Sequence, residues 1–231
     1  MNKYKKIVSI AATAVMCVAP MSVYAQEAQT DVIEAVAEKK QDTESSSVPV
    51  LQKEGIEISE GTGYDLSKEP GAATVKALEQ GTIVISYKTT SENAIQSLLS
   101  VGNGTKGNQD RHFHLYITNA GGVGMELRNT DGEFKYTLDC PAAVRGSYKG
   151  ERVSNTVALK ADKENKQYKL FANGELIATL DQEAFKFISD ITGVDNVMLG
   201  GTMRQGTVAY PFGGSIERMQ VYRDVLSDDE L

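Results

Sequence analysis

The chain has 231 residues and a formal net charge of −7, with 41% hydrophobic and 24% charged residues. This size allows roughly one or two domains with an ordinary hydrophobic core. The acidic balance argues against a nucleic-acid-binding protein, which usually needs a broad basic face. Two His and two Cys argue against a structural zinc site, and we expect no metal and no other cofactor.

The first 25 residues have the pattern of a secretory signal peptide. Three lysines before residue 7 precede an apolar run over residues 7–18, which is too short to span a membrane, and residues 23–25 fit a cleavage site. Lipid attachment at Cys17 is the weaker alternative, because residues 14–16 match a lipobox poorly. We therefore expect a protein that is secreted or held at the cell surface, with no membrane span.

Residues 26–54 are predicted to form a disordered leader. The segment is polar and acidic and contains neither Gly nor an aromatic residue, so it cannot bury much surface. The compact part is expected from Gly55 to Leu231 as one domain.

Residues 55–231 have the pattern of an all-β domain. Short runs of Val, Ile, Tyr, Phe and Thr are separated by Gly, Asn and Asp turns, without a βαβ rhythm. This pattern predicts a sandwich or jelly roll of antiparallel strands. The expected strands are Ile56–Ser59, Thr82–Lys88, Ile95–Val101, His112–Thr118, Gly124–Asn129, Val153–Ala161, Gln167–Asn173, Glu175–Leu180, Asn196–Leu199 and Ser215–Tyr222.

The turns and the few helical segments are also predicted. Asn173-Gly174 is a strong hairpin signal between two of these strands. One or two helical turns are expected at Asp181–Ile188. A capped helix start is expected at Ser227–Leu231, because Ser227 is followed three residues later by Glu230.

Two neighbouring strands are expected to place polar side chains on one face of a sheet. Alternation directs His112, His114 and Tyr116 to one face, and their apolar neighbours to the core. Pairing Ile117 with Met125 matches the core faces of the two strands. That register predicts two pairs on the outer face: Tyr116 with Glu126, and His114 with Arg128.

Tyr116, Glu126 and Arg128 together suit an acidic sugar. They offer an apolar plate, a hydrogen-bond acceptor and a bidentate donor, which match a carboxylate with neighbouring hydroxyls. A second arginine, Arg204, lies in a Gly-rich loop at residues 200–206, shortly before Tyr210. The alternative for the three strand residues is an ordinary solvated surface, and the alternative for the Gly-rich loop is an ordinary turn between strands.

Other chemistry is less well supported by the residues. Asp110, His112 and His114 share a face and could hold a metal ion, although a fourth ligand is missing. A jelly-roll glycosidase would need two carboxylates across its site, and Glu126 has no acidic partner two or four residues ahead on its strand. We therefore expect no catalytic residue, and a hydrolase is the least favoured hypothesis.

The C-terminal segment, residues 212–231, resembles the closing strand and capping turn of concanavalin/laminin-G-like jelly rolls. Residues 55–231, with Tyr64-Asp65-Leu66-Ser67, Gly81-Thr82-Ile83-Val84 and the Glu126-x-Arg128 pattern, resemble the family 40 carbohydrate-binding module. This lectin domain binds sialic acid and precedes the catalytic propeller of secreted bacterial sialidases, intramolecular trans-sialidases of gut bacteria among them. Related folds often carry a structural calcium ion, and the sequence does not decide whether this chain binds one.

The resemblance implies a role for each site residue. Arg128 and Arg204 would clamp the sialic acid carboxylate, and Glu126 would accept hydrogen bonds from the amide and a hydroxyl. Tyr116 and Tyr210 would line the sugar, and Ile95 would receive the acetyl methyl group.

The implied function is a non-catalytic module, most simply a monomer, that binds α2,3- and α2,6-linked sialylated glycans on mucins and targets a parent sialidase. The alternative is a laminin-G-like adhesion module for another glycan or a protein.

Overall fold

The computed structural model describes residues 47–105, 107, 110–129, 133–144 and 153–231. The predicted signal peptide, residues 1–25, and residues 26–46 of the predicted leader lie outside the described residues. Within the described part of the chain, no helix is long and apolar enough to cross a membrane.

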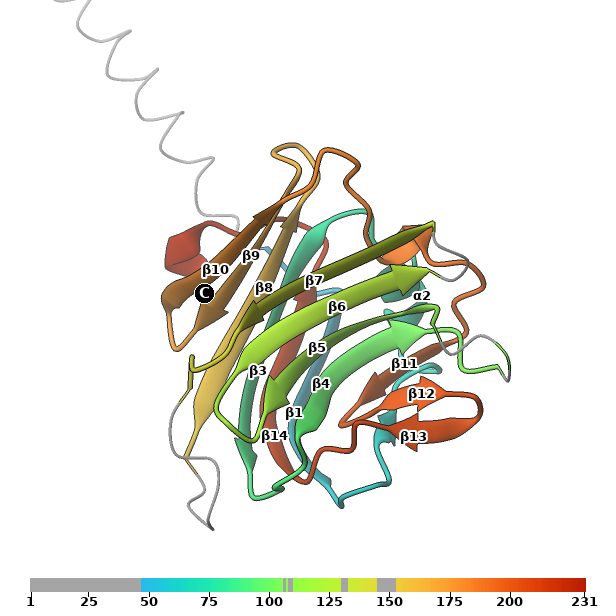
Figure 1. The fold of residues 1–231 in the computed structure, drawn as a ribbon, viewed down its shortest axis with the longest axis vertical. Coiled ribbons are helices and arrows are strands. Elements are labelled where there is room, and N and C mark those ends of the chain that lie inside the picture. Colours follow the sequence, from blue (N-terminus) through green and yellow to red (C-terminus); the bar gives the residue numbers. More distant parts are fainter. Residues whose placement is uncertain (1–46, 106, 108–109, 130–132, 145–152) are drawn as a thin grey trace, which may run out of the picture. The chain divides into compact units, whose positions relative to one another are not determined.

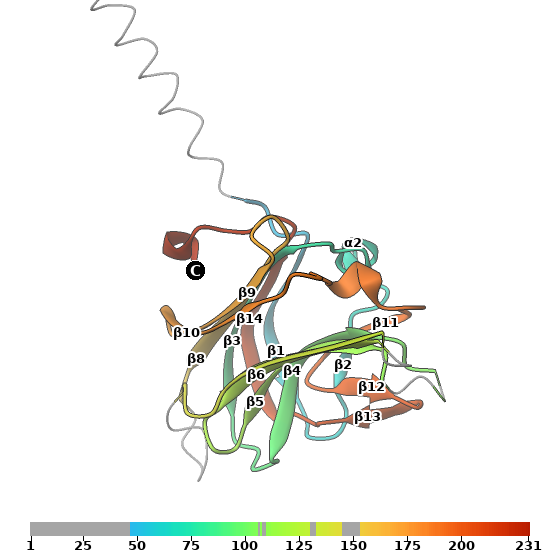
Figure 2. The same ribbon diagram turned by 45° about the horizontal axis from the view of Figure 1, so that its top comes forward.

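Two six-stranded antiparallel sheets lie face to face (Figure 1), and Figure 2 shows them as two layers. Sheet A contains, in spatial order, β1 (Leu51–Ile58), β14 (Gly214–Tyr222), β3 (Gly81–Thr89), β8 (Asn155–Asp162), β9 (Gln167–Ala172) and β10 (Glu175–Asp181). Sheet B contains β2 (Tyr64–Asp65), β11 (Asn196–Leu199), β4 (Ile95–Gly102), β5 (His112–Thr118), β6 (Val123–Asn129) and β7 (Phe134–Cys140). This architecture confirms the predicted jelly-roll β-sandwich.

The remaining elements are short. Strands β12 (Thr202–Arg204) and β13 (Thr207–Ala209) form a separate hairpin, which lies beside β11 and β4 in Figure 1. The described helical segments are α2 (Ala72–Lys76) and two 3-10 turns, η1 (Ile188–Asp190) and η2 (Asp228–Glu230).

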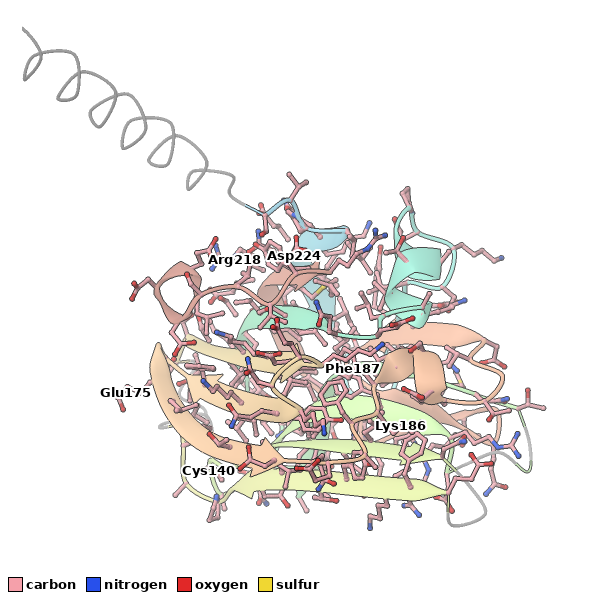
Figure 3. The ribbon with its side chains drawn as sticks, turned by 90° about the horizontal axis from the view of Figure 1, so that it is seen from above. Cys140, Glu175, Lys186, Phe187, Arg218 and Asp224 are labelled. Carbon is pink, nitrogen blue, oxygen red and sulfur yellow. The ribbon has the colours of Figure 1, made fainter. Side chains whose placement is uncertain are left out.

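The hydrophobic core lies between the two sheets. Ile85 and Tyr87 of β3 and Phe113 of β5 are completely buried there. The ring of Phe113 meets that of Phe187 edge to face at 5.7 Å, and Phe187 lies between the layers when the domain is seen from above (Figure 3). Each such side chain stabilises the fold by about 1.5–3 kcal/mol through burial.

Every strand expected from the sequence is present, and some elements were not predicted. Strand β7 was missed, as were the short β2, β12 and β13 and the helix α2. Strand β1 begins at Leu51, four residues before the expected start of the compact part. Leu51 is buried and pairs with Val221 of β14, so the end of the predicted leader is part of sheet A.

The turn predictions had mixed outcomes. Asn173 and Gly174 both have positive φ, 52° and 84°, as the predicted two-residue hairpin turn requires. The helix expected at Asp181–Ile188 was wrong. Asp181 ends β10, and the next residue, Gln182, donates its backbone N–H to the Lys166 carbonyl at 2.8 Å. The chain therefore stays extended beside the residue that precedes β9 and does not form a helix.

The capped helix start predicted at Ser227 is confirmed, and it forms one turn of 3-10 helix, η2. The Glu230 carboxylate accepts hydrogen bonds from the backbone N–H and the hydroxyl of Ser227, both at 2.8 Å.

Candidate functional site

The register of β5 and β6 differs from the predicted one by two residues. Leu115, not Ile117, lies opposite Met125, so Tyr116 lies opposite Gly124 and not opposite Glu126. Likewise, Glu126 is the partner of His114, and Arg128 is the partner of His112. A shift of two residues leaves every side chain on the same face, so the hydrophobic pattern cannot detect it.

The turn between the two strands sets this register. The backbone N–H of Thr118 donates to the Gly122 carbonyl at 2.9 Å, and that of Gly121 donates back to Thr118 at 3.0 Å. Gly121 has a φ of 81°, a conformation that suits glycine.

Gly124 gives Tyr116 its place on the outer face of sheet B. A Cβ atom at residue 124 would lie 2.5 Å from Cζ of Tyr116, so only glycine lets the ring cross the neighbouring strand. The phenol donates a hydrogen bond to the carboxylate of Asp139 on β7. Burial and this contact raise the pKa of Tyr116 above its ordinary value, and the phenol therefore stays protonated.

The two histidines lie at the base of the same face and are buried. His114 lies between two aromatic rings, with centroid distances of 4.7 Å to Tyr116 and 5.2 Å to Tyr210. The ring of His112 meets it edge to face at 5.3 Å. Burial lowers the pKa of His114 to about 3, with further contributions from His112 and the nearby arginines, so the ring is neutral at physiological pH.

The hairpin β12–β13 covers these rings. Thr202 donates its hydroxyl to Ser97 Oγ on β4 at 3.1 Å, and Ser100 Oγ donates to the Gly201 carbonyl at 2.8 Å. The backbone N–H of Ser97 donates to the Tyr210 carbonyl at 2.9 Å. Tyr210 has a φ of 51°, a left-handed conformation that costs about 1–3 kcal/mol, and these contacts hold it so that its ring packs on His114.

Arg128 of β6 and Arg204 of β12 converge above this base. Arg204 Nη1 donates to the Tyr210 hydroxyl at 2.8 Å, and its guanidinium carbon lies 5.5 Å from the centroid of that ring. Arg128 Nη2 and Arg204 Nη2 lie 3.2 and 3.1 Å from the same atom, Oδ1 of Asp110. The two guanidinium groups, each about one quarter exposed, therefore point at one position.

Glu126 lies beside this pair as an ionised acceptor. Its Oε1 is 3.2 Å from His112 Nε2 and 3.5 Å from Arg128 Nη1, and its Oε2 is 3.4 Å from Lys135 Nζ. Burial would raise the pKa of this carboxyl, but the contact with His112 and the charge of Arg128 outweigh it and lower the pKa to about 2. The group is a carboxylate at physiological pH and accepts hydrogen bonds only.

Ile95 lies on the same outer face, at the start of β4. It pairs with Thr118, two positions along the strands from the pair that Ser97 forms with Tyr116, and it is 36% exposed. The side chain is therefore available to a ligand and is not part of the core. A shallow cavity of about 440 Å³ lies beside Arg204, lined by Gln205, Thr207 and Ala209.

The structure thus gathers five of the six predicted residues in one cluster and places Ile95 on their face. Glu126 contacts Arg128, and Arg204 contacts Tyr210. Asp110 links the two arginines, and His114 links Tyr116 to Tyr210. The metal hypothesis for Asp110, His112 and His114 fails, because Asp110 pairs with the two arginines instead of joining the histidines. The ligand atoms of His112, His114 and Glu126 do lie within 4.8 Å of one another. However, the guanidinium groups beside them oppose a cation.

The jelly-roll fold, with an arginine pair and aromatic side chains on the outer face of one sheet, is the arrangement of a lectin-like domain, and this face is its candidate ligand site. The chain belongs to the family described as "Sialidase, N-terminal domain", whose model matches residues 23–231.

Three relatives illustrate the similarity. The anhydrosialidase of Macrobdella decora is 64% identical over 216 residues, which are 91% of this chain and 28% of that protein, so the chain spans little more than a quarter of this relative. A structure described as the Ruminococcus gnavus IT-sialidase CBM40 bound to α2,6 sialyllactose is 99% identical, with a TM-score of 0.78 over 80% of this chain and 97% of that one. A second structure of that module, bound to α2,3 sialyllactose, is 96% identical over the same shares of the two chains, with a TM-score of 0.76.

Proposed function

We propose that residues 47–231 form a non-catalytic carbohydrate-binding module that recognises terminal sialic acid and directs a sialidase to sialylated mucin glycans. The protein that carries this module would act outside the cell, where such glycans are found. The catalytic reaction would belong to a separate domain of a longer protein, since the chain matches only the N-terminal domain of sialidases.

The convergence of Arg128 and Arg204 on one position is the observation that carries this proposal. Two guanidinium groups that share a target fit a carboxylate, which accepts paired hydrogen bonds from planar donors. Sialic acid bears a carboxylate on its ring, whereas neutral sugars have no group that would use both arginines.

The neighbouring side chains supply the other contacts that sialic acid needs. The ionised Glu126 would accept hydrogen bonds from the amide N–H and from a ring hydroxyl. Tyr116 and Tyr210 would contact the sugar ring, and the exposed Ile95 would receive the acetyl methyl group. The two structures of a similar module, described as bound to α2,6 and α2,3 sialyllactose, support this assignment.

A glycan array with matched sialylated and desialylated sugars tests the function. We expect binding to the sialylated member of each pair only, with a dissociation constant on the order of 10⁻⁴–10⁻³ M for sialyllactose, because one sugar on a shallow face buries little area. Retention on mucin would then depend on several modules or on a tethered enzyme. Equal binding to both members of the pairs would refute the proposal and favour an adhesion module for another glycan.

A further inference from the structure

Asp110 lies where the proposed ligand carboxylate would have to bind. It stands two residues before β5, and its Oδ1 lies 3.2 Å from Arg128 Nη2 and 3.1 Å from Arg204 Nη2. The protein thus already supplies a carboxylate to the position at which its two guanidinium groups converge.

This arrangement has an electrostatic reason. Arg128 and Arg204 would repel each other if they faced one position with nothing between them. One carboxylate oxygen between the two guanidinium groups removes this repulsion and keeps them pointed at the same position. Asp110 also halves the positive charge that the arginine pair offers to an incoming anion.

The ion pairs of Asp110 are weak enough to be replaced. All three side chains are between 24% and 28% exposed, so water reaches these ion pairs and weakens them. A ligand carboxylate that brings further contacts with Glu126 and the aromatic rings can therefore displace the Asp110 carboxylate, whereas a small anion without those contacts gains little.

We propose that Asp110 is a built-in competitor of the ligand, which occupies the arginine pair in the free protein and gives way to the carboxylate of sialic acid. This inference rests on the proposed function. Binding then exchanges one carboxylate for another, so the arginines contribute less net affinity than they would without Asp110, and the choice of ligand depends more on the rest of the sugar. Asp110 would in this way keep the affinity low and exclude simple carboxylates.

Asp110→Asn and Asp110→Ala test this proposal by calorimetric titration with 6′-sialyllactose. Both variants should bind about three- to tenfold more tightly than the wild type, because the competing charge is gone. Acetate, added as a simple carboxylate, should inhibit sialyllactose binding more strongly in both variants than in the wild type. Asp181→Asn is the matched control, since it removes one exposed carboxylate from β10 in the other sheet and should leave the affinity unchanged.

The possible outcomes separate the two proposals. If the wild type binds sialyllactose and both Asp110 variants bind it equally or more weakly, Asp110 touches the ligand or only positions the arginines, and the competitor is refuted while the proposed function stands. If the wild type does not bind sialyllactose, the proposed function fails and the role of Asp110 fails with it. Melting temperatures are measured first, and if Asp110→Ala does not fold, the isosteric Asp110→Asn carries the test.

Discussion

The two faces of β5 are both buried, but for different reasons. Phe113 and Leu115 point inward, are fully buried and belong to the hydrophobic core. His112 and His114 alternate with them, point outward and are nearly as buried, because the hairpin β12–β13 and neighbouring side chains cover them. The same strand thus builds a hydrophobic core on one side and a polar base for a binding site on the other.

This difference shows that burial alone does not identify a core. On the inner face, burial itself is favourable, since it removes apolar surface from water. On the outer face, burial is tolerated only because each polar group has a partner or carries no charge, as with the neutral ring of His114 and the paired carboxylate of Glu126. We therefore expect changes on the inner face to affect stability, and changes on the outer face to affect ligand binding and the response to pH.

The largest effect should come from the inner face. Phe113→Ala removes a fully buried ring that packs on Phe187, and it should lower the free energy of unfolding by about 3–5 kcal/mol. Urea denaturation of the variant and the wild type measures this loss. The fraction that remains folded should still bind sialyllactose with unchanged affinity, and a selective loss of affinity without a loss of stability would contradict the separation of the two faces.

The next effect should come from acid, through the outer face. Unfolded His114 takes up a proton below its ordinary pKa of 6.5, whereas folded His114 stays neutral down to a pKa of about 3. Stability should therefore fall as the pH falls through that window, by about 2–3 kcal/mol between pH 7 and pH 4.5 from this group. The Glu126 carboxylate, with a pKa of about 2 in the fold, adds a loss of the same sign below pH 4.5.

His114→Phe is the variant that isolates this effect. It keeps an aromatic ring between Tyr116 and Tyr210 but cannot take up a proton, so its melting temperature should drop less between pH 7 and pH 4.5 than that of the wild type. For each protein, the quantity compared is the change in melting temperature from pH 7 to pH 4.5. The melting temperatures themselves are not compared, because the variant also loses the contact with Thr202 at every pH. The same drop in both proteins would mean that other groups cause the acid sensitivity.

The arginine pair should affect binding without affecting the fold. Arg128→Ala and Arg204→Ala each remove charge-assisted hydrogen bonds worth roughly 1.5–3 kcal/mol, enough to bring a millimolar affinity below detection. Both side chains are about one quarter exposed, and surface changes usually alter stability by less than about 0.5 kcal/mol. Thermal melting alongside titration with sialyllactose tests both statements.

Two conservative variants sharpen this test. Arg204→Lys keeps the charge but loses the planar donor, so it should also bind poorly. Glu126→Gln should cost less than either arginine, because it removes a repulsion with the ligand as well as an acceptor. Unchanged binding in both alanine variants would place the site elsewhere, and a large fall in melting temperature would make the arginines structural.

The sequence predicted which side chains lie on each face of the sheet better than it predicted which of them contact one another. The period of two in β5 and β6 assigned every side chain to the correct face, which is why Tyr116, Glu126 and Arg128 were found together. It could not fix the register, since a shift of two residues preserves the pattern and only the turn at Gly121 decides it.

The sequence pattern also did not predict that the hairpin β12–β13 would lie over the outer face of sheet B. A three-residue strand such as β12 has too few residues to show alternation, so nothing indicated that Thr202 of this hairpin would contact the buried His114. The role of Asp110 was missed for a similar reason. It contacts Arg204, 94 residues further along the chain, and no local pattern predicts such a pair.

The smallest predicted effect concerns the sugar that follows sialic acid. The proposed contacts of Arg128, Arg204 and Glu126 all involve the terminal residue, and the site is a shallow outer face instead of a deep cleft. The second sugar should therefore point to solvent, and 3′- and 6′-sialyllactose should bind within about tenfold of each other, a difference below about 1.4 kcal/mol. Calorimetry with both ligands under the same buffer conditions measures the ratio, and lactose without sialic acid serves as the control. A much larger preference would mean that a side chain outside the arginine pair reads the second sugar. The residues that line the shallow cavity beside Arg204, which are Gln205, Thr207 and Ala209, would then be the first to substitute.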